Sequence, residues 1–163
     1  ARAGRGLRQA YLDGGDLAAR TDMSLCSLLS GLALANGKLG AAHGLAGPLG
    51  GFLGAPHGAI TAAVMAPVSR ANIAALASDP ENPALARYAE VGELLTGERS
   101  AEAYLDWFAE TAAMLGIEGL ATLGLTDADV PQLAEAAGRA SSTKGNPVRL
   151  PLDALEQVLR EAM

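Results

Sequence analysis

The chain of 163 residues contains only two histidines, and both lie in a stretch without Asp, Glu, Lys or Arg. This stretch comprises the 31 residues between Lys38 and Arg70, and His43 and His57 lie fourteen positions apart within it. Burying an imidazole in apolar surroundings costs free energy unless a hydrogen bond or a metal ion compensates. Neutral imidazole is the commonest protein ligand for divalent transition metals, so the two histidines are candidate metal ligands.

A simpler interpretation is that each ring bonds to a backbone carbonyl and binds no metal. Short metal motifs such as H-E-x-x-H place both rings on one helix face. Here a Gly/Pro-rich segment separates the rings and is expected to end one helix and begin another: Gly47, Pro48, Gly50, Gly51, Gly54 and Pro56. Convergence of the rings depends on the tertiary fold, and spacing alone leaves both interpretations open.

Composition limits the class of protein. The length of 163 residues suits one domain, and half of the residues are hydrophobic but only 4% are aromatic, which predicts a core of Leu and Ala. The net charge of −6 disfavours nucleic acid as a partner, because phosphate contacts need clustered Lys and Arg. Glycines and prolines interrupt the uncharged stretch, so we expect no membrane span of about 20 apolar residues.

The cysteine content points to a reducing compartment. Cys26 is the single cysteine, which excludes an internal disulfide and fits the cytoplasm. It lies in an apolar run, where we expect a small buried core residue rather than a nucleophile. The Arg-rich N-terminus lacks the apolar core of a signal peptide, so no targeting segment is visible.

Helix signals recur along the chain, whereas strand signals are scarce, with nine Ile and Val residues in total. We therefore predict an all-α multi-helix bundle of six or more helices with no sheet. Caps and stop residues predict the helices: Asp16 to Gly37, around His43, His57 towards Asn72, Asn82-Pro83 to Gly97, Ser100 to Gly116, one from a capping box at Thr126–Asp129, and one from Pro151.

The run GKLGAAHGLAGPLGGFLGAPHGAITAAVMAPVSRAN resembles the hallmark of the iron-containing alcohol dehydrogenases, including the maleylacetate reductase branch. The family pattern is approximately G-x-x-H-x-x-[AC]-H-x-[LI]-G, then P-H-G, then an apolar helix with Pro and a terminal Asn. The residues in register are His43, Pro48-Leu49-Gly50, Pro56-His57-Gly58, Pro67 and Asn72. The resemblance extends to nearly the whole chain through Ala86–Val91, the Leu-Gly-Ile after the Trp107 helix, and Gly145-Asn146-Pro147.

This resemblance implies a fold similar to dehydroquinate synthase, in which an N-terminal α/β domain binds NAD or NADP and a C-terminal helical domain holds a divalent metal. Residues 1–163 then form the helical metal-binding domain, and the nucleotide-binding domain is absent from this chain. His43 and His57 correspond to two of the metal ligands, with Fe²⁺ or Zn²⁺ as the ion. No cofactor-binding residue is expected in this chain, since the family's Gly-Gly-Gly-Ser motif is missing.

Two departures from the family pattern bear on catalysis. Many members place a further His four residues after the first ligand, credited with positioning substrate or relaying a proton, but this chain has Gly47. The catalytic residues are therefore unknown. The other two ligands lie in an upstream D-x-x-x-H helix, a motif that this chain does not contain.

The leading hypothesis is the metal-binding half of an NAD(P)-dependent oxidoreductase acting on an alcohol, an aldehyde, a ketone or a related carbonyl substrate such as maleylacetate. The complete enzyme is expected to be a cytoplasmic homodimer, and the isolated chain to be inactive. The alternative is a stand-alone helical interaction domain with structural histidines. An upstream D-x-x-x-H and Gly-Gly-Gly-Ser would favour the enzyme.

Overall fold

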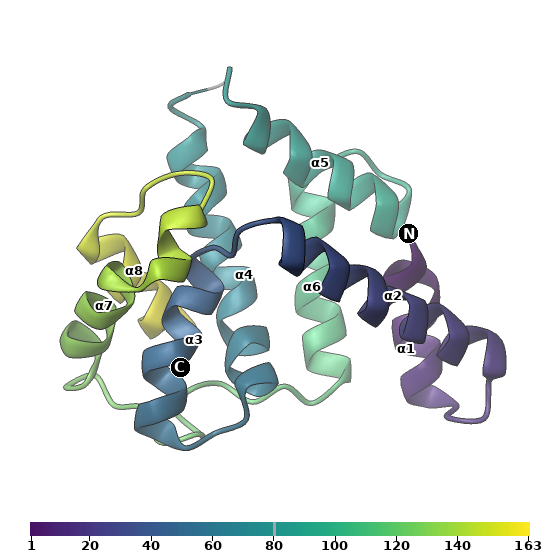
Figure 1. The fold of residues 1–163 in the computed structure, drawn as a ribbon, viewed down its shortest axis with the longest axis horizontal. Coiled ribbons are helices and arrows are strands. Elements are labelled where there is room, and N and C mark those ends of the chain that lie inside the picture. The colour runs from purple at the N-terminus through teal and green to yellow at the C-terminus, as the bar shows by residue number, and fades with distance from the viewer. Residues whose placement is uncertain (80) are drawn as a thin grey trace. The chain divides into compact units, whose positions relative to one another are not determined.

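The computed structural model describes residues 1–79 and 81–163, and every regular element in these ranges is a helix (Figure 1). The prediction of an all-α fold with six or more helices and no sheet is confirmed for this part of the chain. The elements are α1 (Arg2–Leu12), α2 (Leu17–Asn36), α3 (Ala41–Leu53), α4 (His57–Leu76), α5 (Pro83–Thr96), α6 (Ala101–Met114), α7 (Val130–Arg139), the 3₁₀ helix η1 (Ser141–Gly145) and α8 (Leu152–Glu161).

The helices pack as two compact units. The first unit comprises residues 1–37 and 85–116, with α1, α2, α6 and most of α5, and the second comprises residues 38–84 and 117–163, with α3, α4, α7, η1 and α8. The expectation of one helical metal-binding domain over residues 1–163 stays a prediction.

Polar side chains connect α1 to its neighbours in the first unit. Asp22 of α2 accepts hydrogen bonds from Arg2 at 2.5 Å and from Arg5 at 3.0 Å. Arg8 of α1 donates to the hydroxyl of Thr111 on α6 at 2.8 Å, and Thr111 is buried. Hydrogen bonds that involve an ionised group are stronger than neutral ones, so these contacts hold α1 against α2 and α6. Few large apolar side chains of this unit are buried to contribute in the same way.

An apolar core defines the second unit. Leucine, valine, isoleucine and alanine side chains from α3, α4, α7 and α8 form one buried cluster, in which Leu45, Leu49, Ile60 and Val64 are fully buried. The two helices predicted around His43 and from His57 towards Asn72 are present as α3 and α4, and they provide much of the core of this unit.

Local capping signals place several helix ends correctly. The Asp16 carboxylate accepts hydrogen bonds from the backbone of Ala18 and Ala19, both at 3.0 Å, at the start of α2. The Ser100 hydroxyl accepts from Ala103 at 3.0 Å and starts α6. The amide oxygen of Asn82 accepts from the Ala84 backbone at 3.0 Å where α5 begins. Each cap satisfies backbone donors that the helix leaves open.

The structure places the end of α3 at the far end of the Gly/Pro-rich segment, corrects two expectations and adds one helix. α3 continues through Gly47 and Pro48 and ends only at Gly54, whose φ of 63° lies in the left-handed region. The Asp129 carboxylate bonds back to Thr126 as in a capping box, but α7 begins later, at Val130. Helix α1 was not predicted, and Cys26 is only half-buried.

One helix of the described residues, His57–Leu76, is long and apolar enough to cross a membrane, and the bent pair of α2 and α3 passes the same test together. Soluble proteins have core helices of this kind, and α4 carries seven buried residues.

Candidate metal centre

The structure brings the two histidines together. His43 is the third residue of α3 and His57 is the first residue of α4, and their ring centroids lie 5.4 Å apart at an interplanar angle of 48°. Two imidazoles that share one tetrahedral ion through bonds of about 2.0–2.1 Å have ring centres roughly 5 Å apart. The observed separation therefore suits a shared divalent ion, and we call His43 and His57 the histidine pair.

The three residues between α3 and α4 produce this convergence. Gly54 ends α3 in the left-handed conformation, and its backbone N–H donates to the carbonyl of Gly50 at 3.1 Å. Pro56 then precedes α4, and its carbonyl accepts from Ala59 at 3.0 Å and from Ile60 at 3.2 Å. Glycine at the C-terminal cap and proline before a helix both suit a sharp reversal of the chain.

The two rings differ in burial. His43 is half-buried and His57 is exposed, so the assumption that both imidazoles are buried is wrong for His57. Burial lowers the pKa of His43 below its ordinary value, and the charge of a protonated His57 lowers it further. His43 is thus held in the neutral form, which is the form that binds a metal ion.

The histidine pair has no third candidate metal ligand beside it among the described residues. Among residues 1–79 and 81–163, no group of three or more His, Cys, Asp or Glu side chains is arranged to hold a metal ion. Structural and catalytic sites for zinc need three or four protein ligands. The chemistry and spacing of the histidine pair fit two ligands of a divalent ion.

Gly47 lies one helical turn after His43 on α3, where residues four apart share a face. It is exposed, and a Cβ built there meets no heavy atom within 4 Å. The structure therefore has room for a side chain at the position where many family members carry a histidine, and this chain leaves it empty.

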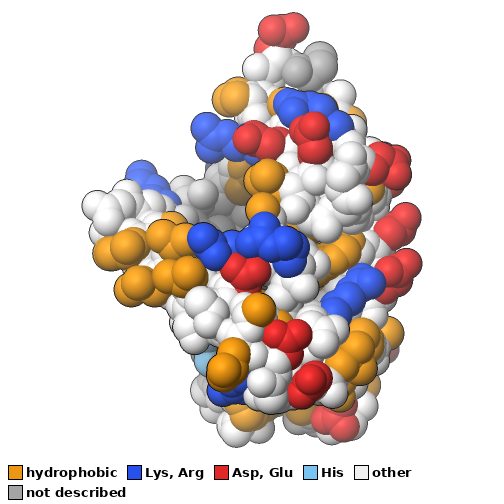
Figure 2. Space-filling model, turned by 90° about the vertical axis from the view of Figure 1, so that its right-hand side faces the viewer, with side chains coloured by type: hydrophobic (Ala, Val, Ile, Leu, Met, Phe, Trp, Pro, Cys, Tyr) orange, Lys and Arg blue, Asp and Glu red, His pale blue; other side chains and the backbone are white. Residues whose placement is uncertain are grey.

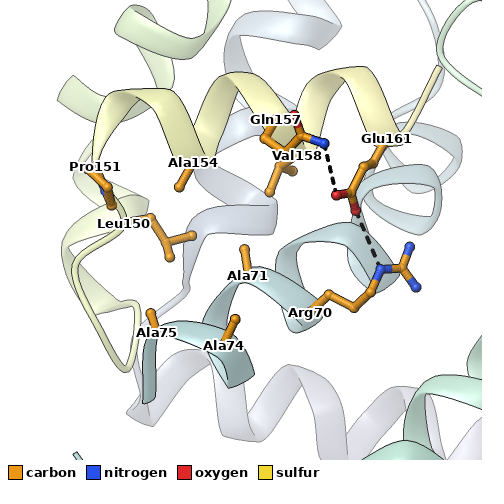
Figure 3. Close-up of a pocket in the computed structure, with 10 residues that line it drawn as sticks. All are labelled: Arg70, Ala71, Ala74, Ala75, Leu150, Pro151, Ala154, Gln157, Val158 and Glu161. Carbon is orange, nitrogen blue, oxygen red and sulfur yellow. Dashed lines mark hydrogen bonds and ion pairs between the residues drawn. The ribbon is translucent and has the colours of Figure 1, made fainter. Parts of the chain in front are cut away.

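A separate hollow lies between α4 and α8. Its volume is about 420 Å³, alanines line its floor, and Arg70 donates to Glu161 at 3.4 Å at one end (Figure 3). Neither histidine lines this hollow, so the hollow is distinct from the candidate metal centre.

Comparison with known proteins gives consistent results. A model described as "Fe-containing alcohol dehydrogenase family, C-terminal" matches residues 3–163. The chain is 34% identical to a 1,3-propanediol dehydrogenase of Citrobacter freundii, over 97% of this chain and 41% of that protein. It is 32% identical to alcohol dehydrogenase 4 of Schizosaccharomyces pombe, over 96% of this chain and 36% of that protein.

A solved structure shares the fold. The crystal structure of a 1,3-propanediol oxidoreductase superposes with a TM-score of 0.86 at 30% identity, over 99% of this chain and 42% of that one. The chain thus spans about two-fifths of the length of the relatives it matches.

Proposed function

Because this chain belongs to the iron-containing alcohol dehydrogenase family, as its C-terminal part, we propose that it is the metal-binding half of a metal-dependent oxidoreductase. The complete enzyme interconverts alcohols with aldehydes or ketones, or reduces a related carbonyl compound, and uses NAD or NADP. The observation that carries the proposal is the histidine pair, whose rings lie 5.4 Å apart at the starts of two helices.

His43 and His57 would hold the metal ion, either Fe²⁺ or Zn²⁺. When bound, such an ion acts as a Lewis acid that polarises the oxygen of the substrate. His43 is half-buried on α3, whereas the exposure of His57 leaves that ring open to substrate and to further ligands.

Gly47 shapes the proton path. Glycine has no side chain that can donate or accept a proton, so this position takes no part in a proton relay between the alcohol and solvent. The open space above Gly47 admits water or a bulkier substrate beside His43. We expect the proton to leave through water or through a group outside this chain.

The remaining parts of the proposal concern the complete protein. The nucleotide belongs to an N-terminal α/β domain and the other two metal ligands to an upstream D-x-x-x-H helix, consistent with the two-fifths of the relatives' length that this chain spans. We expect a cytoplasmic homodimer whose partner is a small alcohol or carbonyl substrate, with no nucleic acid and no membrane. The acidic composition and the single cysteine support this expectation.

Replacement of each histidine in the complete protein tests the proposal. His43→Ala and His57→Ala should each lower metal content and turnover together, by at least the 10–100-fold typical of changes around metal ligands. Arg139→Ala, an exposed change on α7, is the matched control and should alter neither. Full metal content and turnover in both histidine variants would refute the proposal and favour structural histidines.

The 163-residue chain offers a second test. With two ligands it should retain little metal after dialysis against a chelator and should show no dehydrogenase activity. Elemental analysis that found one tightly held metal ion per chain would contradict the half-site interpretation.

A further inference from the structure

The first turn of α3, which carries His43, is capped from a distant part of the chain. Gly40 precedes α3 and has no side chain to cap it. Instead, the amide oxygen of Asn146 accepts a hydrogen bond from the backbone N–H of Ala41 at 3.0 Å, across 105 positions of sequence. This bond satisfies one of the donors that a helix start leaves open, two residues before His43.

The side-chain amide of Asn146 is itself bonded to α4, the helix that begins with His57. The amide nitrogen of Asn146 donates to the side-chain oxygen of Asn72 on α4 at 2.6 Å and to the carbonyl of Val148 at 2.7 Å. Asn72 donates back to the amide oxygen of Asn146 at 3.3 Å, and it is only 3% exposed. We call Asn72 and Asn146 the amide pair. Asn146 bonds to the start of α3, which carries His43, and Asn72 is a residue of α4, which begins with His57.

Close packing leaves the first turn of α3 little freedom. A Cβ at Gly44, the residue after His43, would collide with the hydroxyl of Thr143 in η1. A Cβ at Gly40 would lie 2.9 Å from the amide oxygen of Asn146, and one at Gly145 would collide with the carbonyl of Leu39. The Thr143 hydroxyl also donates to the carbonyl of Ala137 at 2.6 Å, which anchors η1 to α7.

We infer that Asn146, oriented by Asn72, is a positioning residue that holds the first turn of α3 so that the His43 ring faces His57. It touches neither ring, and it acts by fixing the backbone from which His43 projects. Its effect on metal affinity rests on the proposed function, whereas its effect on the order of the turn does not. Groups that orient metal ligands typically change metal affinity 10–100-fold when they are removed.

Metal affinity in the complete protein tests the inference. Metal-free protein is titrated with Co²⁺ alone, and the visible absorption of the bound ion reports both affinity and coordination geometry. Asn146→Ala and Asn72→Ala should weaken Co²⁺ binding at least tenfold and alter the spectrum. Asn146→Asp keeps an oxygen that can accept from Ala41 but loses the two bonds that its amide nitrogen donates, so it should restore the affinity only in part.

A matched control separates positioning from stability. Val158→Ala removes two buried methyl groups from α8 in the same core, and no hydrogen bond of the amide pair involves a side chain there. It should lower the melting temperature yet leave Co²⁺ affinity and spectrum unchanged. An equal loss of affinity in Val158→Ala and Asn146→Ala, or full affinity in Asn146→Ala, would overturn the inference.

Hydrogen–deuterium exchange of the metal-free protein gives a readout that does not depend on the proposed function. In Asn146→Ala the peptide covering residues 39–46 should exchange faster than in the wild type. In Val158→Ala the exchange of this peptide should increase no more than that of other peptides from the same core. Faster exchange there in a protein that binds no Co²⁺ would refute the proposed function and keep the inference. Unchanged exchange of this peptide in Asn146→Ala would refute the inference.

Discussion

The second half of α2 and the helix α3 have similar apolar sequences but opposite environments. Every residue from 27 to 36 is exposed, and Leu28, Leu29, Leu32 and Leu34 expose 53–59% of their surface. In α3, by contrast, Leu45 and Leu49 are fully buried. Apolar composition therefore does not determine burial, which depends on whether other helices pack against the segment.

The two units differ in the same way. The second unit has one continuous cluster of buried aliphatic side chains, whereas the buried residues of the first unit's helices are few and small. Figure 2 shows hydrophobic side chains in patches between Lys, Arg, Asp and Glu side chains of both signs on one face of the molecule. Stability should accordingly be concentrated in the second unit.

Truncation of one leucine in each helix should give the largest difference. Leu45→Ala in α3 removes a fully buried side chain and should cost about 2–5 kcal/mol in the free energy of unfolding. Leu32→Ala in α2 removes a side chain that is 54% exposed and should change stability by less than about 0.5 kcal/mol. Urea denaturation measures both. Equal losses would mean that α2 is covered in solution.

Two glycines of α3 provide a sharper test within one helix. Gly44→Ala forces a methyl group against Thr143 and should destabilise the protein by about 1–3 kcal/mol. Gly47→Ala places the same methyl group in open space and should stabilise the helix by about 0.5–1 kcal/mol. Thermal unfolding of the two variants should therefore shift in opposite directions. A shift in the same direction would contradict the close contact between α3 and η1.

Arg8 tests whether polar contacts hold the first unit. Its guanidinium donates to Thr111 at 2.8 Å and to the Trp107 carbonyl at 3.0 Å, and it lies 5.3 Å from the centre of the Trp107 ring. Arg8→Ala should cost about 1–2 kcal/mol, because hydrogen bonds of charged groups are lost beside a buried hydroxyl.

Arg139 serves as the control, since it makes only an exposed pair with Glu135. Arg139→Ala should change the free energy of unfolding by less than about 0.5 kcal/mol. Indistinguishable denaturation midpoints for the two arginine variants would show that these polar contacts contribute little to the first unit.

The smallest expected effect is the pH dependence that His43 confers on the second unit. Because the pKa of His43 is lowered from 6.5, the unfolded chain binds more protons than the folded chain just below that pH. Stability should therefore fall as the pH drops below about 6.5 and level off once His43 is protonated in the folded state. Denaturation midpoints across this range measure the effect.

Two variants isolate the cause. His43→Gln should lose this part of the pH dependence. His57→Ala should move the pKa of His43 only part of the way to its ordinary value, because burial is the larger cause. A nuclear magnetic resonance titration that showed full recovery in His57→Ala would assign the shift to the neighbouring charge instead.

Features encoded by neighbouring residues were predictable from the sequence. Asp16 and Ser100 cap the helices that follow them, as side chains close to the backbone donors that they satisfy. The resemblance also identified the histidine pair before the fold was known, although its role as a metal site stays a prediction. The structure adds that the rings are close enough to share an ion.

Features that depend on distant residues were not predictable. Helix α1 contains Gly4 and Gly6, and a Cβ at Gly6 would lie 3.1 Å from the Ala19 carbonyl of α2, so packing on α2 overrides a weak helix propensity. Asn146 caps α3 across 105 positions, and no local pattern reports such a bond. The exposure of His57 likewise follows from how α4 packs rather than from its uncharged neighbours.

The glycines around the histidine pair are of two kinds: some have no room for a side chain, and others face open space and should tolerate substitution. A saturation library built to alter substrate range should keep Gly40, Gly44 and Gly145, where a Cβ meets Asn146, Thr143 and the Leu39 carbonyl, respectively. Codons 47 and 58 are the ones to randomise, because a Cβ at either glycine meets nothing within 4 Å. New side chains at these two positions would enter open space close in sequence to the histidines, so the helices that carry the histidines should keep their packing.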